Sequence, residues 1–249
     1  MSGRLDRNVA DRVHRIEDAH VNWYLVEEDG RVAAYDTGVP RSWLSLHEAL
    51  AAIDRIPGDL EAIVLTHGHL DHLGFAEQAR HELDIPVLIH EDEVWLARHP
   101  MRYRTERSPL LYLGNPGLWR IMGTIARAGA LTTPKVAELT TFSDGEVLDV
   151  PGRPRVVYTP GHTFGHCSFH LPDRDAVIAG DALVTLNLYT GGRGPELMPR
   201  GSTADSAQAQ RSLDRLEETG ASTLLPGHGE PWHDGVDEAA RRARAAGIG

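Results

Sequence analysis

Five short apolar runs in the sequence each lead into a histidine or an aspartate, and this pattern restricts the fold more than any other feature. The runs are VAAYDTG, AIVLTHGHLDH, RVVYTPGH, AVIAGD and STLLPGH. Short apolar runs rich in Val, Ile and Leu are typical of buried β-strands. In layered α/β folds the loops after such strands converge at one edge of the sheet, where ligands bind. The sequence therefore predicts strands that bring His and Asp side chains to a common edge.

Helical patterns alternate with these strands. RSWLSLHEALAAI places Trp43, Leu46, Leu50 and Ile53 on one helical face. The other predicted elements are two strands around the Asp29-Gly30 turn, helices over 73–83 and 203–220, strands over 85–90, 145–150 and 155–160, a hairpin over 167–181, a strand over 222–228 and a C-terminal helix. The alternation predicts a mixed α/β (α+β) fold, with residues 1–249 forming a single domain.

The segment 97–135 differs from the rest of the chain. Four prolines interrupt it, and LWRIMGTIARAGAL predicts a helix within it. The segment carries a charge of +6, whereas the rest of the chain carries −17. We interpret it as a helical insertion near 97–135 that covers the edge where the strand-end residues meet.

The overall charge argues against nucleic acids and membranes as general partners. The chain has 36 acidic and 25 basic residues, a net charge of −11, which gives no general attraction to polyanions. The first twenty residues are charged throughout, and no apolar run approaches the roughly 20 residues that cross a bilayer. We therefore expect a cytoplasmic protein. The single cysteine, Cys167, excludes an intrachain disulfide, and we expect it to be a packed apolar residue.

The densest group of candidate metal ligands is the sequence HGHLDH at 67–72. Imidazole and carboxylate groups bind zinc well, and they also bind iron and manganese. His67 and His69 are two residues apart, so in extended backbone their side chains point to the same side. The candidate ligands from all the strand ends are His67, His69, Asp71, His72, His162, Asp181 and His228. This set suffices for two divalent cations if one carboxylate bridges them. The isolated histidines, expected to be surface residues, are His14, His20, His47, His81 and His99.

With these residues in this order, the sequence resembles the metallo-β-lactamase-fold superfamily. The family signature H-x-H-x-D-H stands at 67–72, and the later TPGH, AGD and PGH blocks extend the resemblance over about 35–230. The resemblance implies a four-layer αββα sandwich of two mixed sheets, with metals at one edge between them. It also implies that Asp36, in YDTG, supports the site without binding metal. It further implies two sets of metal ligands. One set is His67, His69 and His162, the other is Asp71, His72 and His228, and Asp181 bridges the two metals.

Asp181 favours the glyoxalase II and lactonase-like branch of the family, whereas two other positions differ from the glyoxalase II enzymes and the lactonases themselves. β-Lactamases of this fold generally lack the bridging aspartate that Asp181 supplies. Glyoxalase II enzymes have a helical C-terminal extension, whereas only about twenty residues follow His228 here. Acyl-homoserine lactonases have a tyrosine where this chain has Val184, and the nearest tyrosine beyond it is Tyr189. Flavodiiron proteins have glutamate in place of His69.

These residues predict a dinuclear zinc hydrolase in which a metal-bound hydroxide attacks the carbonyl of a small ester, thioester or lactone. Two cations about 3.5–4 Å apart lower the pKa of water toward about 7. Asp71 is the candidate catalytic residue, which orients the nucleophile or carries a proton. Two alternatives on the same fold stay open. One is a persulfide (sulfur) dioxygenase with a single iron, and the other is a nuclease that uses the basic insertion.

The insertion predicts the kind of substrate. Its apolar residues and arginines predict a pocket for an apolar acyl or aromatic group with a negative charge. The arginines expected to bind that charge are Arg102, Arg104 and Arg107. The apolar residues expected around the group are Leu110, Leu111, Tyr112, Leu113, Trp119, Ile121 and Met122. In the alternative, the insertion is an amphipathic cap whose arginines face water or the second subunit of a homodimer.

Overall fold

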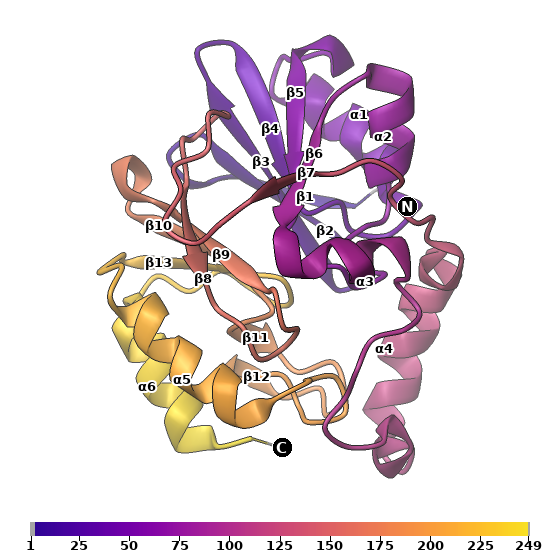
Figure 1. Cartoon of the computed structure of the whole chain (residues 1–249), viewed down its shortest axis with the longest axis vertical. Helices are drawn as coiled ribbons and strands as arrows, with labels where there is room; N and C mark the ends of the chain where they lie inside the picture. Colours follow the sequence, from indigo (N-terminus) through magenta and orange to yellow (C-terminus); the bar gives the residue numbers. More distant parts are fainter. Residues whose placement is uncertain (1–2, 249) are drawn as a thin grey trace.

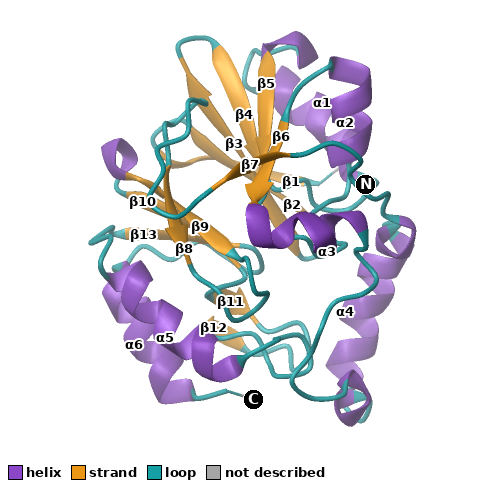
Figure 2. Cartoon of the chain, in the orientation of Figure 1, coloured by secondary structure: helices purple, strands orange, loops and turns teal. Residues whose placement is uncertain are grey.

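Two mixed β-sheets form the centre of the molecule, and helices cover their outer faces. Figure 1 shows the chain as a computed structural model, which describes residues 3–248. Within that range there are six α-helices and thirteen strands. Figure 2 shows the strands gathered between two groups of helices. Among residues 3–248, no helix combines the length and apolar character that crossing a membrane requires.

The first sheet contains the first seven strands in sequence order. Neighbours from β1 to β4 pair antiparallel, and neighbours from β4 to β7 pair parallel. Its strands are β1 (Arg4–Ala10), β2 (Val13–Asp18), β3 (Val21–Glu28), β4 (Arg31–Tyr35), β5 (Leu60–Val64), β6 (Val87–His90) and β7 (Thr140–Phe142). The helices that connect or flank its parallel strands are α1 (Ser42–Ala52), α2 (Ala76–Leu83) and α3 (Val94–Arg98).

The second sheet has the order β13-β10-β9-β8, and it is also mixed because β10 pairs parallel with β13 and antiparallel with β9. A separate pair, β11 and β12, follows β10 in the chain. The strands are β8 (Arg155–Tyr158), β9 (Cys167–Leu171), β10 (Ala176–Gly180), β11 (Val184–Leu186), β12 (Arg193–Glu196) and β13 (Thr223–Pro226). The remaining helices are α4 (Pro116–Arg127), α5 (Ser206–Glu217) and α6 (Val236–Ala246).

The alternation of side chains along the strands produces the layers. In β3, Trp23 and Leu25 pack under α1 and α2, whereas Tyr24 and Val26 face the second sheet. In β10, Ile178 faces the first sheet, and its neighbours Val177 and Ala179 pack against α5 and α6. Three apolar cores therefore separate four layers, which confirms the predicted αββα sandwich of two mixed sheets.

The insertion contains a helix, as expected, and this helix packs beside the four layers. Asn115 caps α4 by accepting a hydrogen bond from the Gly117 amide, and Pro116 begins the helix. The buried face of α4 joins a fourth apolar cluster with residues from β11 and the loop after it. In Figure 1, α4 lies on the other side of β11 and β12 from α5 and α6.

The predicted strand over 145–150 is wrong. Only a single β-bridge joins Val147 to Arg155 in that stretch. Gly145 has a φ of 77°, which places a turn at the start of the predicted strand. The strand that completes the first sheet is β7, a few residues earlier in the chain.

Candidate metal centre

The seven predicted ligands lie in loops that begin where strands end. His67, His69, Asp71 and His72 follow β5 in the first sheet. Each of the remaining three, His162, Asp181 and His228, follows a strand of the second sheet, namely β8, β10 and β13. The structure brings all seven together at the edge shared by the two sheets. Six of them are buried, and Asp71 is half-buried.

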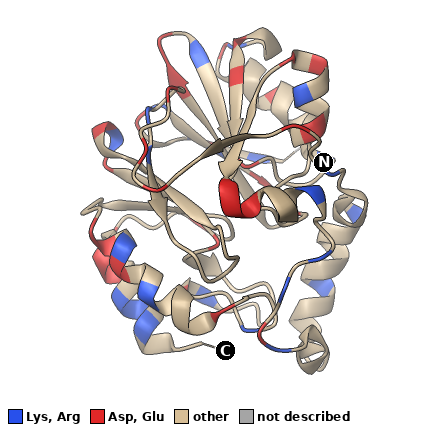
Figure 3. Cartoon of the chain, in the orientation of Figure 1, with Lys and Arg blue, Asp and Glu red and all other residues tan. Residues whose placement is uncertain are grey.

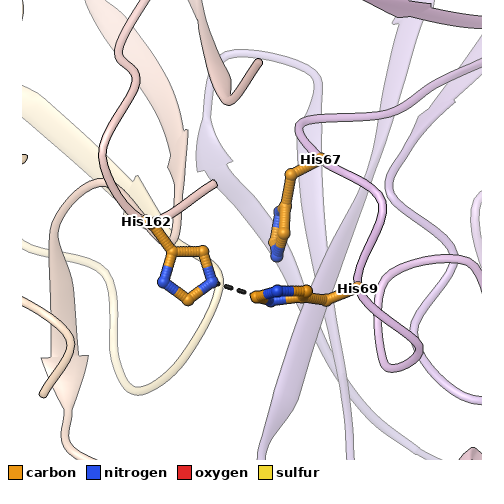
Figure 4. Close-up of side chains that lie close together, drawn as sticks. All are labelled: His67, His69 and His162. Carbon is orange, nitrogen blue, oxygen red and sulfur yellow. Dashed lines mark hydrogen bonds between the residues drawn. The ribbon is translucent and has the colours of Figure 1, made fainter. Parts of the chain in front are cut away.

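The first group consists of His67, His69 and His162, drawn in Figure 4. Their candidate donor atoms all lie within 4.8 Å of one another. Nδ1 of His69 and Nε2 of His162 are 2.9 Å apart and share a hydrogen bond. The ring of His67 meets those of His69 and His162 edge-on, with centroids 4.7 and 4.9 Å away. Three imidazoles from two sheets therefore converge on one point.

The second group consists of Asp71, His72 and His228, whose donor atoms also lie within 4.8 Å of one another. Asp181 lies between the two groups. Its Oδ2 is 3.4 Å from Nε2 of His162 and 3.2 Å from Nε2 of His228. Its Oδ1 is 3.6 Å from Nε2 of His72. This carboxylate is therefore placed as a bridge between two cations would be.

Hydrogen bonds on the far side of three rings determine which nitrogen faces the centre. His72 donates from Nδ1 to Asp36 (2.9 Å), and His228 donates from Nδ1 to the His20 carbonyl (2.8 Å). The Thr66 hydroxyl donates to Asp36 and therefore accepts from Nδ1 of His67 (2.9 Å). In all three rings Nε2 is therefore the nitrogen that faces the centre and that a metal would bind.

Asp36 occupies an unusual backbone conformation. Its φ is 57°, in the left-handed region that aspartate tolerates better than most residues. Its carboxylate accepts bonds from the Thr66 amide and hydroxyl as well as from His72. Asp36 is therefore placed in the supporting role that the resemblance implied for it.

Several donor atoms at the centre are buried without a hydrogen-bond partner in the described part of the chain, and a cation would satisfy them. Nε2 of His67, Nε2 of His72 and Oδ1 of Asp181 are buried and have no hydrogen-bond partner among residues 3–248. A buried polar atom without a partner costs about 1–3 kcal/mol. Coordination to a divalent cation would satisfy all three atoms, and nitrogen and carboxylate oxygen are the donors that zinc and iron accept.

Burial keeps the first group neutral. It lowers the pKa of His69 to about 4, and it lowers the pKa values of His67 and His162 further below their ordinary value, with neighbouring histidines adding to the effect. Burial also acts against a charge on His72, but the carboxylates of Asp181 and Asp36 outweigh it and raise the pKa of His72 to about 10. The three rings of the first group are therefore neutral before a cation binds, whereas a cation competes with a proton at His72.

Two further buried residues shape the site. Glu93 accepts hydrogen bonds from the amides of Gly68 (2.7 Å) and Gly165 (2.8 Å), so it ties the two histidine-bearing loops together. His166 accepts from the Asp181 amide through Nε2 (3.1 Å) and donates from Nδ1 to Thr159. Its lone pair is therefore used on the backbone of Asp181. No sequence pattern indicates Glu93, whereas His166 stands in the same TPGHTFGH block as His162.

A cavity of about 280 Å³ opens beside the ligands. His69, Asp71, His162, Asp181 and His228 line one end of it. The other walls come from the insertion and from the loops around β12, and they are mainly apolar. Tyr103 lines this cavity and also a second recess of about 130 Å³. The insertion therefore lies over the metal edge, as the sequence suggested.

The arginines of the insertion do not line this cavity. None of the residues that line the 280 Å³ cavity is an arginine or a lysine. Arg102 and Arg104 line the smaller recess beside it, where the Arg104 guanidinium lies 5.7 Å from the centre of the Phe164 ring. Figure 3 shows basic residues along the segment that connects α3 to α4.

The prediction that isolated histidines lie on the surface is wrong for His14. This residue is buried in β2, where its Nε2 lies 2.8 Å from Glu27. His20 is half-buried, and the other three are exposed. Cys167 is buried in β9, as expected, and burial raises the pKa of its thiol.

Comparison with known proteins agrees with the fold and the site. The chain matches the family model of the metallo-beta-lactamase superfamily over residues 16–228 and therefore belongs to this superfamily. It is 34% identical over 171 residues to the probable metallo-hydrolase YqgX of Bacillus subtilis (strain 168), a match that covers 68% of each chain. The family relationship makes the protein a member of a metallo-hydrolase superfamily that binds divalent metals. The branch within the family stays a prediction.

Two solved structures are similar along most of the chain. The metallo-beta-lactamase family protein TTHA1429 from Thermus thermophilus is 32% identical, with a TM-score of 0.66 over 91% of this chain and 74% of that one. The protein TTHA1623, solved in a di-iron-bound form, is 28% identical, with a TM-score of 0.60 over 90% of this chain and 93% of that one.

Proposed function

We propose that the protein is a dinuclear zinc hydrolase that acts on a small-molecule ester, thioester or lactone. The observation that supports this best is the position of Asp181, whose carboxylate lies within 3.6 Å of histidines from both ligand groups. His67, His69 and His162 would hold one cation, and Asp71, His72 and His228 the other, with Asp181 shared. Bound cations supply a water nucleophile at neutral pH and neutralise negative charge that develops on the substrate.

The chain's own residues supply orientation and proton transfer. Asp71 is only half-buried and lines the cavity, so its carboxylate has access to substrate. We assign it the catalytic role of orienting the nucleophile or carrying a proton. Buried Asp36, Thr66 and Glu93 hold the ligand-bearing loops in place and do not line the cavity.

Metal analysis and a substrate screen test this function together. Protein purified without added metal should contain about two equivalents of zinc, and the zinc-loaded form should hydrolyse members of an ester, thioester and lactone panel. Asp181→Ala should lower metal content and activity together, because it removes an oxygen close to both groups. One equivalent of iron with oxygen uptake on a persulfide would instead identify a dioxygenase. Cleavage restricted to RNA or DNA would identify a nuclease.

We further propose that the leaving group of the substrate is anionic and binds at Arg102 and Arg104. Both arginines line the recess that adjoins the metal-edge cavity at Tyr103. Of the two acidic residues of that recess, Glu93 is buried and accepts hydrogen bonds from two amides, whereas Asp92 is exposed. Arg102 and Arg104 are both exposed, so their guanidinium groups can reach an anion in the recess.

Alanine variants test the anionic site. Arg102→Ala and Arg104→Ala should each raise KM for an ester with an anionic leaving group roughly tenfold, which is about 1.4 kcal/mol. KM for a neutral ester of the same size should not change. Arg120→Ala, an exposed residue of α4 that lines neither cavity, is the control. A KM for the anionic ester that stays at the wild-type value in both Arg102→Ala and Arg104→Ala would exclude the anionic site.

A further inference from the structure

The large cavity at the metal edge has an apolar wall that the metal chemistry does not explain. We propose that this cavity binds the uncharged hydrocarbon chain of the substrate's acyl group, and that α4 determines the longest chain accepted. The inference rests on the proposed function, because it assumes that the carbonyl carbon lies at the metal end of the cavity. It adds the chemical class of the acyl group and the residues that select it.

One wall of the cavity is a single face of α4. Met122, Ile125 and Ala126 line the cavity, and their spacing of three and four residues places them on the same side of the helix. The helix is fixed in place because Leu118, Ile121 and Ile125 are buried in the fourth apolar cluster. The wall therefore has a defined position relative to the metal ligands.

A second part of the wall comes from the loops on either side of β12. Leu188, Tyr189 and Met198 line it, and all three are buried. The Tyr189 hydroxyl already donates to the Gly201 carbonyl (3.0 Å), so the aromatic ring is what this residue presents to a ligand. Both walls therefore offer carbon atoms rather than free polar groups.

The charges around the cavity indicate that the bound chain is neutral. The charged residues among its lining are Asp71 and Asp181, which both lie at the metal end. A second charge on the chain would be buried without a partner, which is unfavourable. The anionic group proposed above would lie in the neighbouring recess and not at the end of the acyl chain.

The size of the cavity limits the length of the chain. An apolar cavity of roughly 150 Å³ accommodates benzene. At about 280 Å³, this cavity is nearly twice as large, so it has room for roughly ten carbon atoms by the same scale. We therefore expect medium-chain acyl groups to be preferred over acetyl groups and over long fatty acyl chains.

A series of esters with straight acyl chains tests the inference. For the zinc-loaded protein, kcat/KM should rise about fourfold per methylene, as the burial of a methylene group predicts, and should fall beyond about ten carbons. Ala126→Leu fills the cavity from α4 and should shift the optimum to chains about three carbons shorter. Met122→Ala enlarges the cavity and should shift the optimum to longer chains. Arg127→Leu, which adds the same side chain at the exposed neighbouring position, should keep the wild-type optimum.

Binding to the metal-free protein separates this inference from the proposed function. Straight-chain methyl ketones, which cannot be hydrolysed, should bind with affinity that rises with chain length and follows the same shifts in the two variants. Ketone binding without hydrolysis of any ester would support the cavity assignment and contradict the hydrolase. If wild type, Ala126→Leu and Met122→Ala all hydrolyse esters with the same dependence on chain length, the result would support the hydrolase and overturn the cavity assignment. Thermal unfolding of each variant would verify that it is folded.

Discussion

Asp36 connects the backbone of the first sheet to the candidate metal ligand His72. It follows β4 directly, and its carboxylate accepts three hydrogen bonds within the loop after β5. Residues in uncommon backbone conformations persist where their surroundings fix them, and such residues concentrate at functional sites. The conformation of Asp36 thus agrees with a role in holding His72 in one orientation.

Asp36→Asn should weaken the binding of one metal equivalent about 10–100-fold, the usual effect of removing such a supporting carboxylate. Asparagine tolerates the left-handed conformation, so the backbone should remain in place. A competition titration with a metal indicator would measure both affinities. Asp54→Asn is the matched control, because Asp54 has a φ of 58° but is exposed at the end of α1. Equal affinities for both variants would show that Asp36 does not act through His72.

At the scale of elements, hydrogen bonds from buried polar side chains hold β2 and β3 in place. Arg15 is fully buried in β2, and it donates to Glu230 (2.7 Å), which follows His228 by two residues. Asn22, at the start of β3, donates to the carbonyls of Pro226 and Gly229 on either side of His228. These strands therefore position one of the predicted ligands as well as extend the sheet.

Glu27 in β3 gives an acid dependence to the stability of the same region. It accepts hydrogen bonds from His14 in β2 and from Arg55 after α1. Burial acts to raise the pKa of Glu27, but these two partners outweigh it and lower the pKa. Because the folded pKa is below the unfolded value of about 4.3, the contribution is complete above that pH and is lost as the pH falls through the folded pKa.

Glu27→Gln should therefore reduce the free energy of unfolding by about 1.5–3 kcal/mol at pH 7, the range for hydrogen bonds to a charged group. The difference from wild type should shrink below about pH 4. Urea denaturation of the metal-free protein at pH 7 and at pH 3 would measure the difference in the free energy of unfolding. Glu48→Gln, an exposed change on α1, is the control. A difference that stays constant down to pH 3 would contradict the assignment.

Part of the secondary structure could be read from the sequence, and the reason for each failure is physical. β3, β5 and β10 were predicted because their buried faces are apolar. β1 and β2 were not predicted, because residues such as His14 and Arg15 read as exposed, and their partners are distant in the chain. Arg15, for example, is paired with a residue 215 positions away. A local pattern does not contain such a partner.

At the scale of the whole molecule, the candidate ligands come from both halves of the sandwich. Four follow a strand of the first sheet, and three follow strands of the second. A bound cation would therefore join the two halves. The seven residues could be predicted because each stands in a short motif after a strand. The role of Glu93 and the place where the arginine side chains of the insertion lie could not be predicted, because both depend on how distant segments of the chain pack.

Removal of metal should consequently destabilise the whole fold. A ligand present at 1,000 times its Kd stabilises the folded state by about 4 kcal/mol. For a chain of this size, the loss of that energy should lower the melting temperature by roughly 8–16 °C. Calorimetry of the loaded protein with and without a chelator would measure the change. Asp181→Ala should show a smaller response, and an unchanged melting temperature in the wild type would argue against a structural link through the cations.

The separation of α4 from the metal-ligand loops has a consequence for the evolution of this protein. The face of α4 that lines the cavity lies in one contiguous stretch, 122–126, whereas all seven candidate ligands lie outside the insertion. Mutations in that stretch can alter which molecules enter without touching the reactive groups. A duplicated gene could therefore acquire a new specificity through a few changes on one helix, while its ancestral chemistry is inherited intact.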